Sequence, residues 1–370
     1  MRVFILFLAT ALAAGPSFDC WAKDEVQTEY GPVVCHSVTF VDPPNKNAKT
    51  WDGAVTRAVT IALPNETTLC FDADRLSIAG IWRGGFLDFS KTHHTSYKGN
   101  ICPRPAAKPT YPALEQDGWA TPEGKLAQDH RRFDGYYLRG NDVVLEYTVS
   151  GREVYELFGA DKNSITRDLI VAPGKQGVAL LVAHAPKESI VEGHQATVTL
   201  EKGSLAAIVS GDTKALELRQ RDDGLYLNIP ASEEERRFRI RFCVGEKEEC
   251  DDFLTGAKLE KEAPDLTALT KGGPRRWKET FTTEGKLSDQ PGAYVLDDLP
   301  TPTRPYGSWM RLSAIDFFDD GRAAVATLPG DVWLVSWDDG DISKISWQRY
   351  ATGLYEPLGL KVVDGKIYVR

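Results

Sequence analysis

Three aspartates stand around a Trp-Arg-Gly-Gly turn in the first third of the chain, and this group has the chemistry of a small-ligand site. The group consists of Asp72, Asp74, Trp82, Arg83 and Asp88. Carboxylates accept hydrogen bonds from sugar hydroxyls, an indole stacks on a sugar ring, and paired glycines let backbone approach a ligand. These residues are therefore a candidate carbohydrate-binding patch. The alternative interpretation is a structural turn with Trp82 in the core.

Neither the histidines nor the acidic turns have the spacing of a metal site. His93 and His94 form a pair, but adjacent strand residues point to opposite faces, so they would share an ion only within a loop. The aspartates at 316–320 and 338–341 lack the calcium-loop pattern. The chain also has no Cys-x-x-Cys and no Gly-x-Ser-x-Gly motif. We predict no metal site and no covalent haem, and the sequence assigns no catalytic residue.

The chain contains six cysteines, and one pair of them is a candidate disulfide. Residues 238–244 alternate in polarity like a strand, which places Cys243 on the polar face. Cys250 follows in a nearby loop and is close enough in sequence to reach it. The pattern therefore predicts a Cys243–Cys250 disulfide, with two separate free thiols as the alternative.

Residues 1–22 have the pattern of a secretory signal peptide. Arg2 precedes an apolar run from Val3 to Ala14, which is shorter than the about 20 residues that a spanning helix needs. Small residues permit cleavage after Ala13 or after Ala22. We expect a secreted or periplasmic protein without a membrane span after cleavage. An uncleaved N-terminal anchor is the alternative.

The composition is that of a folded globular protein. Of 370 residues, 42% are apolar and 26% are charged, which excludes a disordered chain, a coiled coil and a collagen. The formal net charge of −9 argues against a basic nucleic-acid-binding surface, so we predict no nucleic-acid partner. Many glycines, prolines and aromatic residues favour a β-rich fold.

Short segments of alternating polarity predict a β-sandwich-like domain over residues 23–270. Residues 143–149 alternate like a half-buried strand, and Ser150-Gly151 offers a hairpin turn after it. Residues 178–183 are continuously apolar, as expected for a strand buried on both faces. One short helix is expected over residues 251–262.

The sequence changes in character after the sandwich-like domain. Residues 263–274 form a polar boundary that contains Gly and Pro, and we predict a linker or connecting strand over residues 271–304. Residues 305–370 alternate Asp-Gly turns with strands, as propeller blades do, but supply only one to two blades of the 4–8 that close a ring. We therefore predict an all-β fold with a truncated β-propeller, and a chain that is the front part of a longer protein.

Five segments resemble a known family. They are LCFDADRL at 69–76, WRGGFLD at 82–88, YLRGNDVVLEY at 137–147, GDVWLV at 330–335 and RYATGLYEPLGL at 349–360. The chain resembles exported proteins of planctomycetes and verrucomicrobia that begin with a DUF6797-type domain. In that family the domain is followed by a propeller similar to glucose/sorbosone dehydrogenases. The resemblance covers about residues 30–370.

The resemblance implies an exported accessory domain and the start of a quinone-dependent sugar or alcohol dehydrogenase. In such a full-length protein it implies pyrroloquinoline quinone and calcium, with the active site in later blades, and a downstream c-type cytochrome domain. The fragment itself is then expected to hold no cofactor and to be inactive alone, and whether the protein is an enzyme stays open. The rival hypothesis is a non-catalytic carbohydrate-binding or protein-interaction module of the cell envelope.

Overall fold

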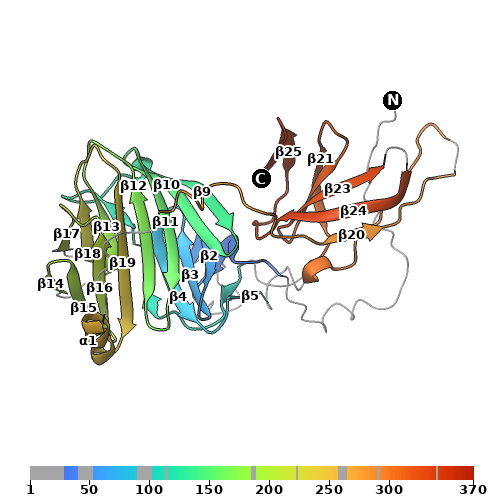
Figure 1. The fold of residues 1–370 in the computed structure, drawn as a ribbon. Helices are drawn as coiled ribbons and strands as arrows, with labels where there is room; N and C mark the ends of the chain where they lie inside the picture. The colour runs from blue at the N-terminus through green and yellow to red at the C-terminus, as the bar shows by residue number, and fades with distance from the viewer. Residues whose placement is uncertain are drawn as a thin grey trace. The chain divides into compact units, whose positions relative to one another are not determined.

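The computed structural model divides the chain into two compact units, which we call the sandwich unit and the C-terminal unit (Figure 1). The structure describes residues 29–40, 53–89, 102–112, 116–184, 189–221, 224–256, 265–289, 292–338 and 341–370. The predicted signal peptide and the His93-His94 pair lie outside these residues. Strands make up nearly all the regular structure described, so the all-β prediction is confirmed.

The sandwich unit covers Pro32–Asp88 and Cys102–Pro274, and its largest sheet has eight antiparallel strands in the order β14-β15-β16-β19-β12-β11-β10-β9. The strands are β9 (Arg131–Arg139), β10 (Asp142–Val149), β11 (Arg152–Ala160), β12 (Ile165–Val171), β14 (Ser189–Glu192), β15 (Gln195–Thr199), β16 (Ser204–Gly211) and β19 (Arg236–Gly245). Burial alternates strictly along β11, as it must when only one face of a strand meets the core. The sequence pattern at 143–149 is therefore confirmed as β10.

Two smaller sheets pack against the large one. The five-stranded sheet runs β1-β2-β3-β4-β7, with β1 (Val33–Thr39), β2 (Ala54–Leu63), β3 (Thr67–Asp72), β4 (Ser77–Arg83) and β7 (Tyr111–Pro112). The four-stranded sheet runs β17-β18-β13-β8, with β8 (Trp119–Ala120), β13 (Val178–His184), β17 (Glu217–Arg221) and β18 (Gly224–Ile229). A short pair, β5 (Leu87–Asp88) with β6 (Arg104–Pro105), completes the unit. All three larger sheets contribute to one apolar core.

Aromatic rings fill the middle of this core. The ring of Phe71 on β3 lies 5.9 Å from that of Tyr147 on β10 and 6.1 Å from that of Phe158 on β11. Strand β13 is buried along almost its whole length, because Leu180 faces this core while Leu181 faces a second cluster with Tyr226. The prediction of a strand buried on both faces is confirmed.

The two smaller sheets meet at Gly118. Its N–H donates to the Arg75 carbonyl at 2.9 Å, and its own carbonyl accepts the Leu181 N–H at 2.9 Å. A Cβ at this position would lie 1.9 Å from the Leu76 carbonyl oxygen, so only glycine lets the chain pass here.

A buried polar network crosses the core. The Arg167 Nε on β12 donates to the Glu156 carboxylate on β11 at 2.6 Å, and the Tyr147 hydroxyl donates to the same carboxylate at 2.6 Å. The Arg167 Nη1 also donates to the Leu181 carbonyl on β13, at 3.0 Å. The network joins the large sheet to the four-stranded sheet and leaves neither charge of the ion pair without a partner.

Helix α1 (Lys247–Gly256) begins earlier than the predicted 251–262 and packs on the large sheet. Cys243 was expected on a polar, accessible face, but α1 covers that face and both Cys243 and Cys250 are buried. The two side chains are neighbours and the structure has them as free thiols, without the predicted disulfide. Burial raises the pKa of Cys243 to about 12.

The C-terminal unit contains a five-stranded antiparallel sheet in the order β20-β24-β23-β22-β21. Its strands are β20 (Thr280–Thr283), β21 (Leu312–Phe317), β22 (Ala323–Thr327), β23 (Val332–Asp338) and β24 (Asp341–Ala351). A hairpin of β25 (Leu360–Val363) and β26 (Lys366–Val369) follows. The segment expected to be a linker or connecting strand thus supplies the edge strand β20 of this sheet.

One buried ion pair organises the core of the C-terminal unit. The Arg349 guanidinium on β24 donates to the Asp331 carboxylate at 2.5 Å, and both side chains are fully buried. The guanidinium lies 4.6 Å from the ring centre of Trp277 and 5.0 Å from that of Tyr306, within range for cation–π attraction. The charges of Arg349 and Asp331 therefore neutralise each other inside the core of the C-terminal unit.

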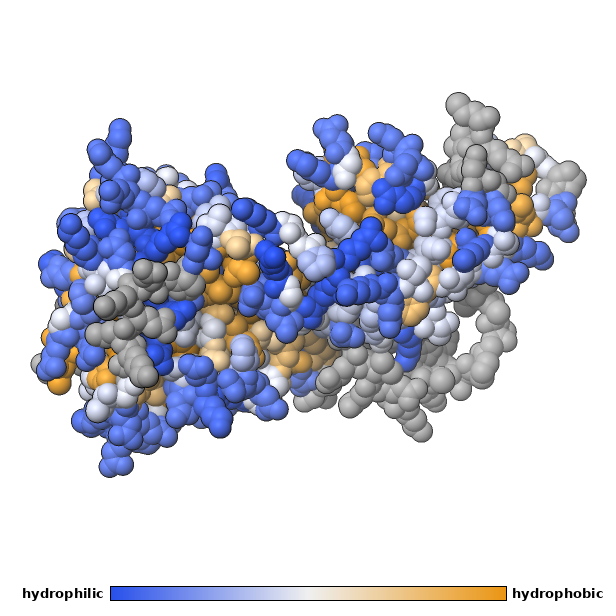
Figure 2. All heavy atoms as spheres, in the orientation of Figure 1, coloured by the Kyte–Doolittle hydropathy of each residue, from blue (hydrophilic) through white to orange (hydrophobic). Residues whose placement is uncertain are grey.

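Apolar side chains are exposed on one part of the C-terminal unit. They belong to β21 and to the β25–β26 hairpin with the residues before it, and are Ile315, Phe317, Leu358, Val363 and Tyr368. Figure 2 shows apolar surface on this unit among the charged side chains. Beside it, the Asp316 carboxylate accepts the Val362 N–H at 2.8 Å and pairs with Lys361 at 2.9 Å, which fixes β25 to β21.

Candidate ligand-binding cleft

The structure separates the members of the predicted carbohydrate patch, which are Asp72, Asp74, Trp82, Arg83 and Asp88. Asp72 and Asp74 lie at the turn between β3 and β4, because the antiparallel register pairs Asp72 with Ser77. Trp82 and Arg83 lie at the far end of β4, roughly 20 Å along the strand. Asp88 is exposed on β5, beyond that end. The structure therefore does not bring the five residues together into one site.

Trp82 is unavailable to a ligand. Its side chain is 0% exposed, and its indole N–H donates to the carbonyls of Gly85 and Phe86 at 3.1 and 2.8 Å. A buried ring cannot stack on a sugar, so the structural alternative describes this residue. Arg83 is partly exposed and donates to the Asp161 carbonyl at 2.8 Å.

The two aspartates at the β3–β4 turn have structural partners. One carboxylate oxygen of Asp72 accepts the N–H groups of Asp74 and Arg75 at 2.9 and 3.2 Å, which closes the turn. Burial raises the pKa of Asp72, and these two hydrogen bonds oppose the rise. Asp74 pairs with Arg57 at 2.6 Å on the surface.

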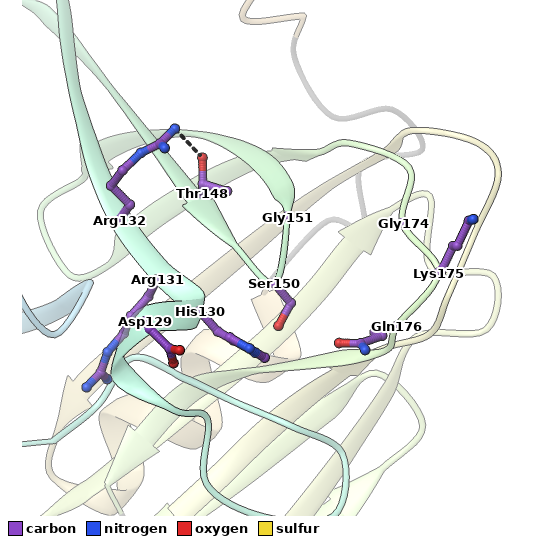
Figure 3. A pocket seen from close by; sticks show the side chains of 10 residues that line it. All are labelled: Asp129, His130, Arg131, Arg132, Thr148, Ser150, Gly151, Gly174, Lys175 and Gln176. Atoms are coloured by element: carbon purple, nitrogen blue, oxygen red, sulfur yellow. Dashed lines mark hydrogen bonds between the residues drawn. The ribbon is translucent and has the colours of Figure 1, made fainter.

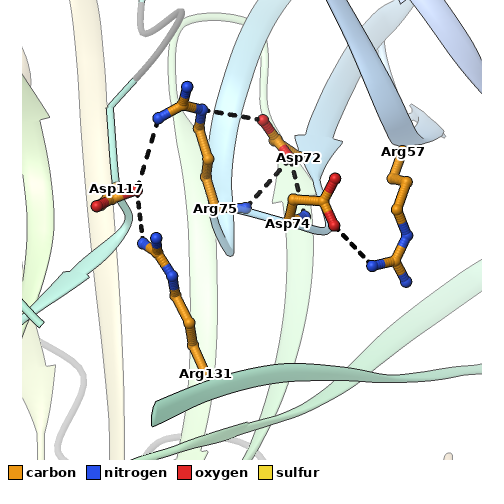
Figure 4. A network of polar contacts seen from close by, with 6 residues as sticks. All are labelled: Arg57, Asp72, Asp74, Arg75, Asp117 and Arg131. Atoms are coloured by element: carbon orange, nitrogen blue, oxygen red, sulfur yellow. Dashed lines mark hydrogen bonds and ion pairs between the residues drawn. The ribbon is translucent and has the colours of Figure 1, made fainter. Parts of the chain in front are cut away.

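Asp117 extends this network to the large sheet (Figure 4). Its carboxylate lies 2.5 Å from the Arg131 guanidinium at the start of β9 and 3.6 Å from that of Arg75. Asp72 of the predicted patch thus belongs to a chain of ion pairs, through Arg75, Asp117 and Arg131, that holds the β3–β4 turn against β9. Arg131 is also part of the wall of a cleft, which the sequence did not indicate as a site.

This polar cleft opens at one end of the large sheet and has a volume of about 660 Å³. Three segments form its wall: 129–132 at the start of β9, 148–151 at the end of β10, and 174–176 after β12. The lining residues are Asp129, His130, Arg131, Arg132, Thr148, Ser150, Gly151, Gly174, Lys175 and Gln176 (Figure 3).

Backbone geometry holds the three segments in place. Ser150 and Gly151 both have positive φ angles, 48° and 75°, which is the conformation of a type I′ hairpin turn and confirms the turn expected here. The Ser150 N–H donates to the His130 carbonyl at 2.7 Å, joining two walls. Gly174 and Ser232 exchange N–H to carbonyl bonds at 2.8 and 3.0 Å, which fixes the third.

Polar side chains face one another across the cleft. Figure 3 shows His130, Ser150 and Gln176 pointing toward its middle, while Lys175 extends from the rim. Arg132 lies on the opposite side, where it donates to the Thr148 hydroxyl at 3.5 Å. The cleft therefore presents hydrogen-bond donors and acceptors on several sides to a bound molecule.

Arg152 lies directly beneath the third wall. The side chain is 1% exposed, and a Cβ on Gly174 would lie 2.4 Å from it. Its guanidinium donates to the carbonyls of Ala172, Gln176 and Pro230 at 2.8, 3.5 and 3.1 Å. Burial, with the positive charge of Arg236, lowers the pKa of Arg152. This arginine supports the wall, and no carboxylate in the part of the chain that the structure describes pairs with its charge.

Asp129, His130 and Ser150 are the residue types of a catalytic triad, but they are not arranged as one. Such a triad needs the base bonded to the nucleophile and the acid bonded to the base. In the described part of the chain no hydrogen bond joins these three side chains.

No group of three or more His, Cys, Asp or Glu side chains among the described residues could hold a metal ion. In the acidic turns examined as calcium candidates, Asp316 pairs with Lys361 and Asp320 pairs with Arg322 at 2.8 Å. These carboxylates are satisfied by nearby cations instead of converging on one point.

The sequence contained one signal for the cleft. Arg152 occupies the inward-facing register of β11 with Val154 and Phe158, where a charged residue is unusual unless it is paired or functional. Nothing in the sequence around His130 indicates the cleft, because the contact between residues 130 and 150 depends on the pairing of β9 with β10. The third wall, residues 174–176, belongs to the loop after β12, and its sequence contains no pattern that indicates a site.

The fold and cleft define an all-β sandwich protein with a polar site at one sheet end. Residues 69–156 match a family described as a domain of unknown function (DUF6797). The matched segment runs from β3 into β11 and includes two of the three cleft walls. No curated protein matches the chain. Across the described ranges, no helix has both the length and the apolar character needed to cross a membrane.

Proposed function

We propose that the protein is an exported, non-catalytic carbohydrate-binding module whose ligand occupies the polar cleft. The observation that carries the proposal is an open cavity of about 660 Å³ whose side chains are positioned to donate and accept hydrogen bonds. Ligand sites commonly occupy roughly 300–1,000 Å³. The signal-like residues 1–22 support a secreted or periplasmic location.

The lining suits a molecule with many hydroxyl groups. The Ser150 hydroxyl and Gln176 amide can each both donate and accept, and the His130 ring has one nitrogen for each role when neutral. Trp82, the only tryptophan of the patch predicted from sequence, is buried elsewhere. Binding in the cleft is therefore expected to depend on polar contacts.

A second proposal concerns the C-terminal unit, which we infer to be the beginning of a propeller similar to sugar dehydrogenases. Strands β21 to β24 pair in sequence order as an antiparallel meander, which is the connectivity of a propeller blade. The following strand β25 is fixed to β21 through Asp316, as the first strand of a next blade would be. The exposed apolar residues of β21 and β25 also fit a surface that further strands cover.

Pyrroloquinoline quinone and calcium belong to this second proposal only as groups of a full-length protein. Asp316, Asp320 and Asp331 each pair with a cation, and no three carboxylates among the described residues of this unit converge as a calcium site would require. We derive no reaction step through either group. A downstream c-type cytochrome domain is likewise proposed as a partner from the resemblance alone.

A glycan array probed with the purified chain tests the carbohydrate proposal. We expect retention of at least one polysaccharide class, and loss of that retention when Gln176→Ala and Ser150→Ala are combined. The matched control is Thr213→Ala on the same unit, outside the cleft. Retention of no glycan would refute the proposal. The second proposal predicts that this chain, given quinone and calcium, does not oxidise glucose; turnover would contradict it.

A further inference from the structure

The polar cleft carries positive charge although the protein as a whole is acidic. The chain has a formal net charge of −9, so a cationic site is not a general property of its surface. We propose that the cleft binds the anionic group of an acidic carbohydrate, a carboxylate or a sulfate ester. This inference rests on the proposed function and specifies the class of its ligand.

The rim supplies the first part of the charge. The Lys175 ammonium is exposed at the edge of the cleft, and no ion pair or hydrogen bond engages it within the described residues. Arg132 stands on the other side, with its Nε bonded to Asp134 at 2.5 Å and its Nη2 directed to Thr148. A lysine without a local partner is available to an incoming anion.

The floor supplies the second part. Arg152 is buried beneath Gly174, and within the described residues its guanidinium donates only to backbone carbonyls. In the same part of the chain its buried Nη2 has no hydrogen-bond partner. Removing a charge from water without an opposite charge is costly. A ligand anion above Gly174 would lower that cost, and a neutral ligand would not.

Neighbouring carboxylates do not neutralise the buried charge of Arg152. Asp212 pairs with Arg236 at 2.9 Å, and the positive charge of Arg236 itself acts on Arg152, so that carboxylate is already engaged. Asp134 is engaged by Arg132. Asp129 lines the cleft, but the cationic residues Arg131, Arg132 and Lys175 in the same lining outnumber it. An anion is therefore the ligand group that best matches the fixed charges.

The test is calorimetric titration of the chain with four probes. They are an oligogalacturonate, a sulfated galactan oligosaccharide, a neutral galacto-oligosaccharide of matching length, and inorganic sulfate. The variants are Lys175→Glu and, as a control of equal charge change outside the cleft, Lys162→Glu. Thermal unfolding of both variants checks that the fold is retained.

We expect one of the acidic oligosaccharides to bind more tightly than the neutral one, and more weakly as salt is added. Lys175→Glu should weaken this binding about tenfold, and Lys162→Glu should leave it unchanged. Preference for the carboxylated or the sulfated oligosaccharide identifies the source of the anion.

The remaining outcomes separate the two proposals. If only the neutral oligosaccharide binds, and Lys175→Glu has no effect, the anionic inference is refuted and the carbohydrate proposal stands. If inorganic sulfate binds in a Lys175-dependent way and no oligosaccharide binds, the carbohydrate proposal fails while the anion site stands. If no probe binds, both are refuted.

Discussion

Removing Arg167 from the buried network should destabilise the sandwich unit far more than removing an exposed arginine. The Arg167 and Glu156 side chains are 3% and 0% exposed, and the Nε to carboxylate distance is 2.6 Å. In Arg167→Met the Glu156 carboxylate keeps only the Tyr147 hydroxyl as a partner. Breaking a buried pair from one side costs about 3–5 kcal/mol.

A double-mutant cycle distinguishes this electrostatic cost from simple loss of packing. Glu156→Leu should also cost several kcal/mol, since it leaves the buried guanidinium of Arg167 unpaired. The double variant removes both charges, so its cost should fall short of the sum by about 2–3 kcal/mol. Urea unfolding measures the free energies, and hydrogen exchange at β11 and β12 confirms that the sandwich unit is the part affected.

The matched control is the exposed pair Arg219–Glu217 on β17, with a distance of 2.9 Å and side chains 55% and 58% exposed. Arg219→Met should cost less than about 1 kcal/mol, because solvent screens the interaction. Equal costs for Arg167→Met and Arg219→Met would refute the reasoning. Strict additivity in the cycle would refute it as well.

Two further changes test other features. Gly118→Ala should lower the free energy of unfolding by about 1–3 kcal/mol, because the new methyl group would overlap the Leu76 carbonyl. Gly124→Ala is the control and should change this free energy little, because the space around Gly124 is open. Equal urea midpoints for the two variants would contradict the prediction. The hydrogen bond from the Val362 N–H, with help from Lys361, lowers the pKa of Asp316 below its ordinary 3.8. The ionised Asp316 carboxylate therefore stabilises the fold fully above pH 3.8, and this stabilisation is lost as the pH falls through the lowered pKa of the folded protein. Hydrogen exchange at β25 should therefore accelerate in acid, and Asp316→Ala should make it fast at neutral pH; protection of β25 unaffected by either change would show that the contact does not hold the strand.

Strand positions were predictable from sequence because one-sided burial leaves a period of two. The alternation at 143–149 and the apolar run at 178–183 both became strands with the expected burial. The start of the helix was predicted too late in the sequence, since its first turn at Lys247 is charged and the helix has few apolar positions. Its burial comes from the sheet beneath it. The same helix explains why the polar face expected around Cys243 is covered.

The site was less predictable than the fold, for reasons of register and distance. Asp72 and Trp82 are close in sequence, but an antiparallel hairpin carries them to opposite ends of β4. Residues 130, 150 and 175 are distant in sequence, yet the ends of β9, β10 and β12 bring them to one cleft. Nearness in sequence therefore wrongly suggested that Asp72 and Trp82 lie together. It gave no sign that residues 130, 150 and 175 do.

The attachment of the third cleft wall has a consequence for how ligand preference can change during evolution. Arg152 holds this loop through main-chain oxygens of Ala172 and Gln176, so the anchor does not depend on which side chains the loop carries. Under the proposed function, a substitution at position 175 would therefore change which ligand binds, while the backbone of the loop would keep its position.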